Sequence, residues 1–428
     1  MGCMPSKSCP IIQVMNNTED KPQYLLQTIL DHNSGVNCID ISEDRSLLIS
    51  GGEDCMARLW STQSHPCECI GVLDGHQSYI TCCAVYKHLV VTGSADNTIK
   101  VWTIEEAQCI ATFIGHQSVV NHVICEGQLI LSTSYDKTAR IWSLYNNFYK
   151  NSSNVITNPI GDNHQCDQQY CVKILEGHDK AVTQVAIICN DEYRLQNGLI
   201  HELDLVVTAS TDTTVRIWTL ITGECHKVLV GHKGPVNCVV SDSNNKRHVY
   251  TGGADAVIKC WDVITGDLIR DLKGHESAIL CLTSHNRILY SGSADQTARA
   301  WAMEYGECTR VYWRNTNAVT CVQYYDGIVY TASGDCTARL YDANSGALKR
   351  TCLGHNLGVG SLKVSPGKMF TGSYDGKVCV WDCTGIVADT VFGNNVANDD
   401  DNSDQTYEDS ANVQNAVKAL DCYIRSFR

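Results

Sequence analysis

The chain of 428 residues lacks the features that would place it in a membrane or on nucleic acid. It has no run of about 18 apolar residues, so we expect no helix that spans a bilayer. Its first residues lack the apolar run, about 7–15 residues long, of a secretory signal. Lys and Arg number 33 against 47 Asp and Glu, which gives a net charge of −14. Because phosphate binding needs clustered positive charge, we expect no nucleic-acid partner.

Sequence patterns of common enzymes and metal sites are missing as well. The chain contains no G-x-x-x-x-G-K-[ST], no H-E-x-x-H, no G-x-S-x-G and no G-x-G-x-x-G pattern. Its 24 cysteines include no C-x-x-C pair, which argues against a zinc ribbon or a thioredoxin-like site. We therefore expect no enzymatic activity, no cofactor, no metal and no small-molecule substrate.

The most informative feature present is an acidic residue followed six positions later by an aromatic ring. A fixed spacing repeated along a chain indicates one supersecondary unit used many times. It occurs eight times, in the pairs Asp54/Trp60, Asp96/Trp102, Asp136/Trp142, Asp212/Trp218, Asp255/Trp261, Asp295/Trp301, Asp335/Tyr341 and Asp375/Trp381.

Two further polar positions recur in each unit. Four residues before the Asp stands a hydroxyl, at Ser50, Thr92, Ser132, Thr208, Thr251, Ser291, Thr331 and Thr371. Seven units open with a histidine and the remaining one with asparagine, at His32, His76, His116, His178, His232, His275, Asn315 and His355. Between these positions apolar and polar residues alternate, as in Thr98–Trp102, which predicts strands separated by turns.

These units resemble WD40 repeats, from the Gly-His dipeptide to the Trp-Asp pairs at Trp261-Asp262 and Trp381-Asp382. The resemblance covers about residues 23–385, and the register also resembles that of the WD repeat-containing protein 86 family. It implies that His, Ser/Thr, Asp and Trp form a hydrogen-bonded tetrad in each blade. A buried indole N–H, hydroxyl and imidazole each need a partner, so we interpret these residues as structural rather than catalytic or metal-binding.

The spacing predicts an all-β, eight-bladed WD40 β-propeller of four-stranded antiparallel blades over residues 23–390, with a seven-bladed ring plus a detached unit as the alternative. The segment Tyr24–Leu30 is expected to close the ring by pairing after Trp381 in the last blade. Two long intervals between histidine positions, 62 and 54 residues, predict insert loops at about 145–170 and 190–204, the first of them disordered.

Many cysteines also follow the repeat. Five lie six residues after the histidine position and four lie shortly before it, at Cys38, Cys82, Cys238, Cys281 and Cys321, and at Cys69, Cys109, Cys225 and Cys308. We expect them to be small buried hydrophobic residues in a reducing compartment.

The two ends differ from the repeats. Residues 1–22 are predicted to be flexible, and Gly2, Cys3 and Ser6 fit a pattern for myristoylation of Gly2 and palmitoylation of Cys3. Residues 391–410 are acidic and predicted to be a disordered linker. Residues 411–428 have the spacing of an amphipathic helix, which would dock on the propeller or bind a partner or a membrane, with disorder as the third reading.

Partner binding is expected on the face formed by the turns before the Asp and after the His, as the resemblance implies. Tyr79, Tyr135 and Tyr374 are candidate anchors there, with ordinary exposed turns as the alternative. In the seventh unit, Trp313 and Arg314 stand where the other units have the residue before the Gly-His dipeptide and its Gly. We expect this pair either to be exposed and to bind a partner, or to compensate for the altered tetrad of that unit.

Seven units carry a base two residues before the aromatic ring, at Arg58, Lys100, Arg140, Arg216, Lys259, Arg299 and Arg339. This ring of cations would bind a phosphopeptide or balance the nearby Asp.

These observations predict a non-enzymatic, cytoplasmic scaffold that binds proteins or peptides. N-terminal acylation would hold it at the cytoplasmic face of a membrane. The alternative function is a substrate-recognition subunit of a ubiquitin ligase, which the absence of a Trp-Asp-x-Arg sequence disfavours.

Overall fold

The computed structural model describes residues 23–144, 170–189, 204–242 and 244–388. The interpretations of residues 1–22, of the two inserts and of residues 391–428 therefore concern segments outside the described residues, apart from Tyr170 and Asp204 at the insert ends. The amide of Ser143 donates to the carbonyl of Tyr170, whose ring packs 5.0 Å from that of Phe113. Asp204 is buried.

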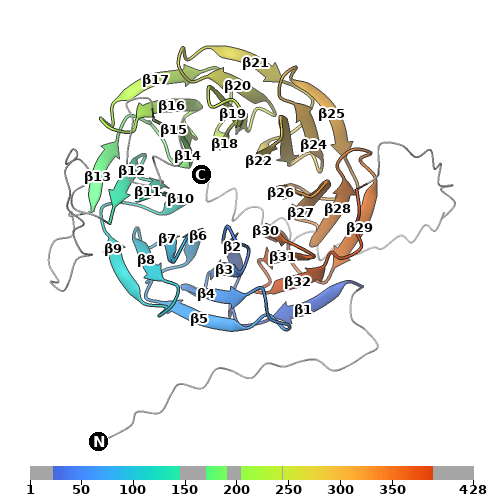
Figure 1. Cartoon of the computed structure of the whole chain (residues 1–428). Coiled ribbons are helices and arrows are strands. Elements are labelled where there is room, and N and C mark those ends of the chain that lie inside the picture. Colours follow the sequence, from blue (N-terminus) through green and yellow to red (C-terminus); the bar gives the residue numbers. More distant parts are fainter. Residues whose placement is uncertain (1–22, 145–169, 190–203, 243, 389–428) are drawn as a thin grey trace, which may run out of the picture.

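The described chain forms eight four-stranded antiparallel sheets arranged as blades around a central axis (Figure 1). Blade 1 contains β2 (Val36–Ile41), β3 (Leu47–Gly52), β4 (Met56–Ser61) and β5 (Cys69–Asp74), and blade 2 contains β6 (Ile80–Tyr86), β7 (Leu89–Ser94), β8 (Ile99–Thr103) and β9 (Cys109–Phe113). Blade 3 contains β10 (Val120–Glu126), β11 (Leu129–Ser134), β12 (Ala139–Ser143) and β13 (Cys171–Leu175), and blade 4 contains β14 (Val182–Ile188), β15 (Leu205–Ser210), β16 (Thr214–Thr219) and β17 (Cys225–Val230).

The second half of the ring repeats the arrangement. Blade 5 contains β18 (Val236–Ser241), β19 (His248–Gly253), β20 (Ile258–Asp262) and β21 (Leu268–Leu272), and blade 6 contains β22 (Ile279–His285), β23 (Ile288–Ser293), β24 (Ala298–Ala302) and β25 (Glu307–Tyr312). Blade 7 contains β26 (Val319–Tyr325), β27 (Ile328–Ser333), β28 (Thr337–Asp342) and β29 (Leu348–Leu353), and blade 8 contains β30 (Val359–Ser365), β31 (Lys368–Ser373), β32 (Val378–Asp382) and β1 (Leu25–Ile29). The predicted eight-bladed all-β propeller is confirmed.

The ring closes as predicted, by a strand from the start of the described chain. β1 pairs antiparallel with β32, with Leu25 opposite Trp381, and the amide of Asp382 donates to the carbonyl of Tyr24 at 2.9 Å. Figure 1 shows β1 and β32, from opposite ends of the sequence, side by side in one blade. This pairing covers the open edge of the last blade and rules out the seven-bladed alternative.

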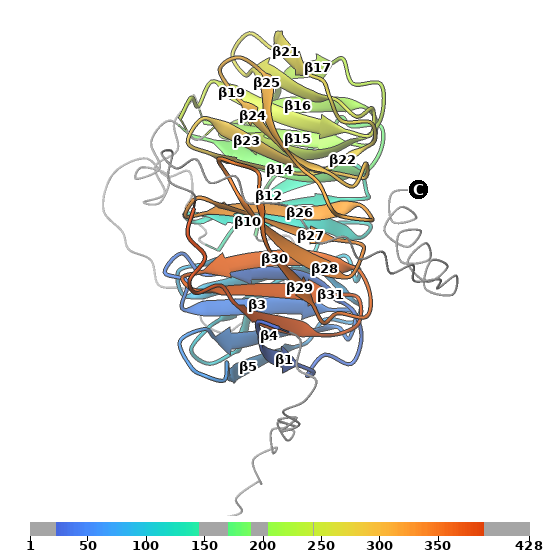
Figure 2. The ribbon, with the colours of Figure 1, turned by 90° about the vertical axis from the view of Figure 1, so that its right-hand side faces the viewer.

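The core lies between neighbouring blades, which stack as layers in the side view (Figure 2). The seven tetrad tryptophans are exposed by 2% or less, at Trp60, Trp102, Trp142, Trp218, Trp261, Trp301 and Trp381. Each packs with aliphatic side chains of the preceding blade, as Trp102 does with Leu59 and Leu73. The core is thus a closed series of inter-blade layers, and each blade depends on its neighbours for burial.

Side chains on the innermost strands join neighbouring blades through hydrogen bonds. At six of the eight junctions an Asn or Thr side chain lies within hydrogen-bond distance of a backbone carbonyl of the next blade, in the pairs Asn37–Ile80, Thr81–Val120, Asn121–Val182, Thr183–Val236, Asn237–Ile279 and Thr320–Val359. Leu280 and Gly360 occupy this position at the other two junctions.

Those two junctions have polar contacts elsewhere. Arg310 Nε donates to the carbonyl of Asn344 at 2.5 Å and joins the outer strand of blade 6 to blade 7. Between blades 8 and 1, Gln27 Nε2 donates to the carbonyl of Cys67 at 3.0 Å, and Lys363 Nζ lies 2.8 Å from Asp40 Oδ1. Every junction of the ring therefore has at least one polar connection besides its apolar layer.

Candidate protein-interaction face

The predicted tetrad residues of each blade lie together. In blade 2, His76 Nδ1 lies 2.8 Å from Asp96 Oδ2 and His76 Nε2 lies 2.8 Å from Thr92 Oγ1. Trp102 Nε1 donates to the same hydroxyl at 2.9 Å. The chain of contacts thus runs from the turn before β8 through a buried imidazole and the hydroxyl to the indole, and it links strands β7 and β8 with two turns.

Six other blades repeat this arrangement. The His–Asp distances are 2.6–3.3 Å, the His–hydroxyl distances 2.7–2.8 Å and the Trp–hydroxyl distances 2.8–2.9 Å. The sets are His32/Ser50/Asp54/Trp60, His116/Ser132/Asp136/Trp142, His178/Thr208/Asp212/Trp218, His232/Thr251/Asp255/Trp261, His275/Ser291/Asp295/Trp301 and His355/Thr371/Asp375/Trp381. Both imidazole nitrogens, the hydroxyl and the indole N–H of each set have partners within the blade, as expected for buried polar groups that support the structure.

The contacts within each tetrad also shift the pKa values of its Asp and His side chains. Burial alone would raise the pKa of Asp136, but the hydrogen bond and charge of His116 hold that pKa well below its usual range. Burial lowers the pKa of His116 although Asp136 opposes the shift. The same balance sets a pKa of about 2 for Asp375, beside His355. The pairs are therefore built to keep the carboxylate charged at neutral pH.

Each tetrad positions the exposed turns around it. The residue after the Asp has a positive φ in all eight blades, at Cys55, Asn97, Lys137, Thr213, Ala256, Gln296, Cys336 and Gly376. The Asp carboxylate stabilises this turn by accepting a hydrogen bond from the amide two residues later. In blade 2, the amide of Thr98 donates to Asp96 Oδ1 at 2.9 Å. The residue before the Asp donates its amide to the turn that follows the His, as Tyr135 N does to Val119 O at 3.0 Å. We call the surface made by these two sets of turns the histidine face.

Blade 7 uses different partners because Asn315 and Tyr341 replace His and Trp. Arg339 Nη1 donates to Asn315 Oδ1 at 2.8 Å and to Asp335 Oδ2 at 2.7 Å. The hydroxyl of Tyr341 donates to the carbonyl of Trp313 at 2.9 Å. A guanidinium thus takes the place of the imidazole between the turn and the strand.

The seven predicted cations do not form one ring of equivalent charges. Arg58 and Arg339 turn inward to Asp54 and Asp335, in the two blades that have Asp31 and Arg314 where the others have glycine. In blades 3, 4 and 6 the arginine lies against that glycine instead, so a β-carbon on the glycine would lie 2.4–2.7 Å from Nη1, in the pairs Gly115–Arg140, Gly177–Arg216 and Gly274–Arg299. Lys259 pairs with Asp271, and Lys100 donates to Thr112.

The predicted tyrosines fall in three blades of the histidine face. Tyr79 of blade 2 is 42% exposed. Tyr135 of blade 3 is half-buried, and burial, with a contribution from Tyr79, raises its pKa to about 12. Tyr374 of blade 8 lies beside Gly35 of blade 1, and its ring occupies the space over Gly360. The structure therefore brings Tyr79 and Tyr135 together and places Tyr374 across blade 1 from them; we call the three the tyrosine arc.

Trp313 and Arg314 form a separate feature in blade 7. Trp313 is 59% exposed, and the guanidinium carbon of Arg314 lies 4.3 Å from its ring centroid. The backbone carbonyl of Trp313 holds the Tyr341 hydroxyl, so the pair both supports the altered blade and presents an exposed indole.

The histidine face also carries a carboxylate that the sequence interpretation did not select. Glu53 Oε2 accepts a hydrogen bond from Ser34 Oγ at 2.8 Å, and both residues flank Gly35 beside Tyr374. Glu53 occupies the same repeat position as Tyr135 and Tyr374, so the repeat alignment contained the signal that located it.

The expected burial of the cysteines is wrong for three of them. Cys82 and Cys238 are buried, and Cys38, Cys69, Cys281 and Cys321 are half-buried, whereas Cys109, Cys225 and Cys308 are exposed. Each exposed cysteine pairs with a tetrad tryptophan where the register shifts, as Cys109 does with Trp102. Cys69 lies opposite Trp60 at the same kind of register shift and is half-buried, so the shift alone does not determine how exposed these thiols are.

Within the described ranges, no group of three or more His, Cys, Asp or Glu side chains has the arrangement of a metal site. A helix long and apolar enough to cross a membrane is likewise not found in this part of the chain.

The blades and their tetrads define a WD40 β-propeller. The family described as WD domain, G-beta repeat matches residues 23–61, 67–103, 107–143, 169–219, 223–262, 266–302, 306–342 and 346–382, and the chain belongs to this family. Propellers of this family generally serve as protein-interaction scaffolds.

Two natural proteins and one designed protein show the following similarity to the chain. It is 23% identical over 218 residues to mitochondrial division protein 1 of Mycosarcoma maydis, covering 50% of this chain and 24% of that protein. It is 39% identical over 67 residues to human WD repeat-containing protein 86, covering 16% of this chain and 17% of that protein. The crystal structure of the computationally designed Ika8 protein superposes with a TM-score of 0.70 at 26% identity, covering 84% of this chain and 99% of that one. The chain thus spans about a quarter or less of the length of these two natural relatives.

Proposed function

We propose that the protein is a non-enzymatic scaffold that binds a protein or peptide partner through the tyrosine arc on its histidine face. The observation that carries this proposal is an exposed aromatic ring on a rigid backbone support, with two half-buried tyrosines on the same face. Tyr79 is 42% exposed, while its backbone carbonyl is held by the amide of Ala95 at 3.0 Å. A rigid amphipathic ring loses little conformational entropy on binding, which is why tyrosine is frequent among interface anchors.

The shape of the face around the arc supports a peptide ligand. The turn residues of blades 4 to 7 nearest the Asp are small, at Thr211, Ala254, Ala294 and Gly334. At this repeat position the side chains of Tyr135 and Tyr374 in blades 3 and 8 are larger, and blade 2 contributes Tyr79 from the turn after its histidine. Glu53 adds one carboxylate within the arc, so a partner with a basic or hydrogen-bond-donating group is favoured over an acidic one.

The relatives support the scaffold class without naming the partner. The similarity to mitochondrial division protein 1 is confined to about a quarter of that protein, and the similarity to WD repeat-containing protein 86 to 67 residues. The proposal therefore rests on the face of this chain, and a role in mitochondrial division is not part of it.

The test replaces Tyr79 with a photo-crosslinking amino acid in the full chain and identifies the captured proteins by mass spectrometry. Tyr305, which is 69% exposed in the turn after β24 at the opposite end of the blades, receives the same amino acid as the matched control. We expect at least one protein that crosslinks at position 79 and not at 305, and whose capture is lost with Glu53→Gln or Tyr374→Ala. Identical captures at both positions would contradict the proposal.

We further propose that acylation of Gly2 and Cys3 holds this scaffold at the cytoplasmic face of a membrane. The support is the sequence pattern alone, because both residues lie outside the described part of the chain. One acyl chain binds a membrane marginally, whereas two bind stably. Metabolic labelling with myristate and palmitate analogues tests this. Gly2→Ala should abolish myristate label and Cys3→Ser palmitate label, and an unlabelled wild type would refute the anchor.

A further inference from the structure

A pocket lies on the face opposite the histidine face, where blades 2 and 3 meet. It is formed by the turn between β6 and β7, the turn between β10 and β11, and Leu144 after β12. Its volume is about 140 Å³. A cavity of about 150 Å³ accommodates benzene, so the pocket takes a group of about six carbon atoms.

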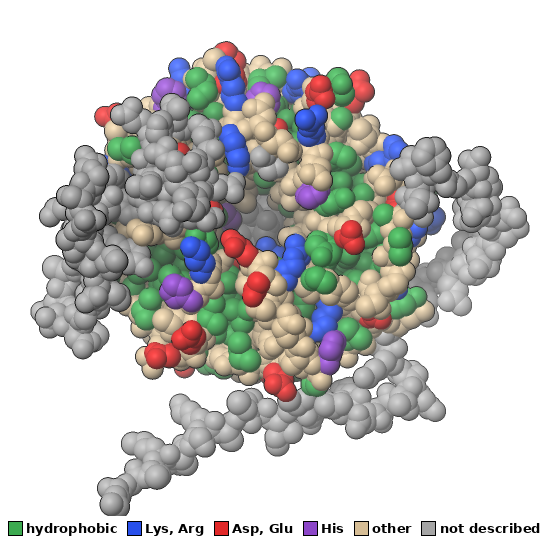
Figure 3. All heavy atoms as spheres, in the orientation of Figure 1, with side chains coloured by type: hydrophobic (Ala, Val, Ile, Leu, Met, Phe, Trp, Pro, Cys, Tyr) green, Lys and Arg blue, Asp and Glu red, His purple; other side chains and the backbone are tan. Residues whose placement is uncertain are grey.

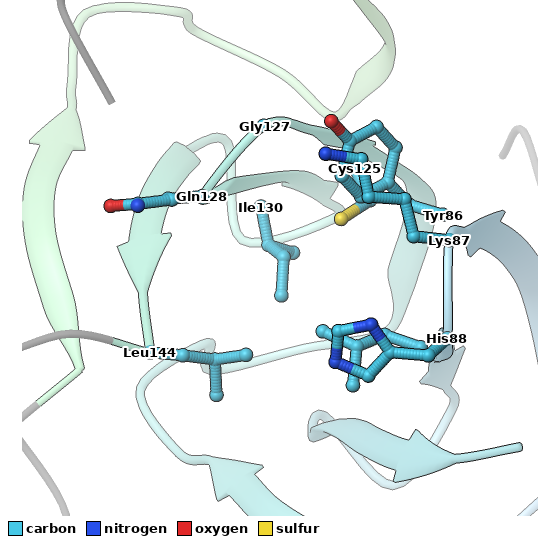
Figure 4. A pocket seen from close by; sticks show the side chains of 9 residues that line it. Tyr86, Lys87, His88, Cys125, Gly127, Gln128, Ile130 and Leu144 are labelled. Carbon is cyan, nitrogen blue, oxygen red and sulfur yellow. The ribbon is translucent and has the colours of Figure 1, made fainter. Parts of the chain in front are cut away.

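The lining mixes polar and apolar side chains, with the imidazole of His88 away from Tyr86 and Lys87 and toward Leu144 (Figure 4). Figure 4 shows the side chains of Tyr86 and Lys87 close together, with Ile130 and Leu144 apart from them. Lys87 Nζ lies 5.1 Å from the centroid of the Tyr86 ring. The ligand that matches this lining therefore combines a short apolar stem with one polar end.

Tyr86 provides the second observation. Its side chain is 6% exposed, yet its hydroxyl is buried without a hydrogen-bond partner among the described residues. A buried hydroxyl without a partner costs free energy, and native proteins rarely leave one. The indole N–H groups of the tetrad tryptophans have partners, and so do the hydroxyls of Tyr250, Tyr312 and Tyr341, whereas that of Tyr135 on the histidine face, like that of Tyr86, has none among the described residues. The Tyr86 hydroxyl therefore lacks a partner in the described structure, which a group in the pocket would supply once it displaces the side chains that cover the oxygen.

The charge of the lining selects the polar end of the ligand. Lys87 and His88 are exposed at its edge, and no Asp or Glu lines it. Burial, and then the charge of Glu126, raises the pKa of Cys125 to about 12, so this thiol is uncharged at neutral pH. An acceptor with negative charge would take the hydroxyl proton of Tyr86 and pair with the ammonium of Lys87.

We propose that this pocket binds a carboxylate on a short aliphatic stem. The carboxylate lies between the Tyr86 hydroxyl and Lys87, and the stem lies against Ile130 and Leu144. A free short-chain carboxylic acid and the C-terminal aliphatic residue of a partner protein share this chemistry. The site is separate from the tyrosine arc, so it stands or falls independently of the proposed function. Figure 3, in the orientation of Figure 1, shows a surface of scattered charges around a central hollow, without one continuous basic patch in its uncovered part.

The experiment is a titration followed by methyl NMR of the full chain, labelled at Ile and Leu methyl groups. The probes are 4-methylpentanoate, its neutral amide, a short peptide ending in a free leucine carboxylate, and the same peptide amidated. We expect saturable shifts at the methyl groups of Ile130 and Leu144 with the carboxylates and none with the amides. Tighter binding of the acid identifies a small molecule as the source, and tighter binding of the peptide identifies a protein C-terminus.

Two variants test the assigned contacts. Tyr86→Phe and Lys87→Gln should each weaken carboxylate binding by about tenfold or more, since hydrogen bonds to charged groups are involved. Tyr86→Phe removes an unpartnered hydroxyl, so its Tm should stay the same or rise, which separates loss of binding from loss of folding. Arg287→Gln, an exposed cation in the corresponding turn of blade 6, is the control and should leave binding unchanged. The proposal is overturned by the absence of saturable shifts, by equal binding of the amides, or by unaltered binding in both variants.

Discussion

Arg339 Nη1 lies 2.7 Å from Asp335 Oδ2 in the blade whose histidine position holds Asn315. Arg58 makes the same contact with Asp54 at 2.8 Å in blade 1. Both blades lack the glycine that elsewhere leaves room for the arginine, since Arg314 and Asp31 stand in its place. The two substitutions are therefore linked, because filling the glycine position goes with an arginine that turns inward and joins the polar network.

Replacing Arg339 should destabilise the protein strongly. Its side chain and that of Asp335 are 10% and 6% exposed, so Arg339→Met would leave a buried carboxylate without its cation. Such losses cost about 3–5 kcal/mol. Arg299→Met is the matched control, because no ion pair with Arg299 is present among the described residues, and it should cost about 1 kcal/mol or less. Urea unfolding of both variants checks this, and equal losses would contradict the role of the pair.

Removing one tetrad hydroxyl should be costly although the change in size is small. Thr208→Val leaves His178 Nε2 and Trp218 Nε1, now 2.8 Å and 2.9 Å from the hydroxyl, without a partner. At about 1–3 kcal/mol for each of these two unsatisfied groups, we expect a loss of about 2–6 kcal/mol. Thr222→Val removes an exposed hydroxyl of the same blade that contacts Thr219 and accepts a hydrogen bond from the amide of Glu224, and it should cost about 1 kcal/mol or less because water replaces these partners. Thermal unfolding followed by near-UV circular dichroism compares them, and a neutral Thr208→Val would show that the tetrad does not stabilise the blade.

The sequence was sufficient for the architecture because the recurring residues are those that must be buried and polar. His76, Thr92, Asp96 and Trp102 can be aligned between units without knowing their contacts. The orientation of outer-strand residues could not be predicted in this way. A register shift lies opposite each tetrad aromatic ring and interrupts the alternation of the outer strand, and alternation alone does not locate such a shift.

Features between blades were also beyond the sequence. The pocket joins Tyr86 of blade 2 to Ile130 and Leu144 of blade 3, and its unpartnered hydroxyl becomes visible only when neighbouring turns are placed in space. The contacts of Arg339 with Asn315 and Asp335 could likewise not be predicted from the sequence. Asn315 and Tyr341 mark blade 7 as different in the sequence, but the residue that compensates for them is fixed by geometry.

The inner hydrogen bonds between blades should be transferable. Asn121 Nδ2 donates to the carbonyl of Val182 at 2.7 Å, and Leu280 holds the equivalent position at a junction without this bond. Asn121→Leu should lower stability by about 1 kcal/mol or more, because the carbonyl loses its partner. Leu280→Asn should raise it by about 0.5–1.5 kcal/mol by donating to Val319. Denaturant midpoints measure both, and a destabilising Leu280→Asn would show that packing outweighs the bond there.

The exposed thiols should react in the folded protein. Cys109, Cys225 and Cys308 are exposed, whereas Cys82, Cys238 and Cys379 are buried, and burial raises the pKa of each of these three to about 12. Since the thiolate is the nucleophile, iodoacetamide at pH 8 should modify the first three and spare the second three until the protein unfolds. Peptide mapping by mass spectrometry reads each site separately. Native modification of Cys82 or Cys238 would contradict the assigned burial.

His122 should make the protein less stable as the pH falls from about 6.5 to 4. It is half-buried in β10, its Nδ1 has no hydrogen-bond partner in the described structure, and burial lowers its pKa to about 4 against a small opposing effect of Asp40. Between these two pKa values the unfolded chain binds a proton that the folded protein does not. The stabilisation is therefore complete above pH 6.5 and lost as the pH approaches 4. At about 1.36 kcal/mol per pKa unit, the shift of 6.5 − 4 units corresponds to at most about 3 kcal/mol.

His122→Leu removes this titration and should flatten the pH dependence in that window. The tetrad carboxylates do not interfere, because their lowered pKa values, about 2 for Asp375, make their contribution disappear only below about pH 4. The tetrad histidines His116 and His232, whose pKa values burial also lowers, give the same slope in both proteins and cancel in the comparison. The free energy of unfolding in urea at pH 7.5, 6.0, 5.0 and 4.5 supplies the measurement. Parallel curves for wild type and His122→Leu would show that His122 binds its proton equally well in the folded and unfolded chain.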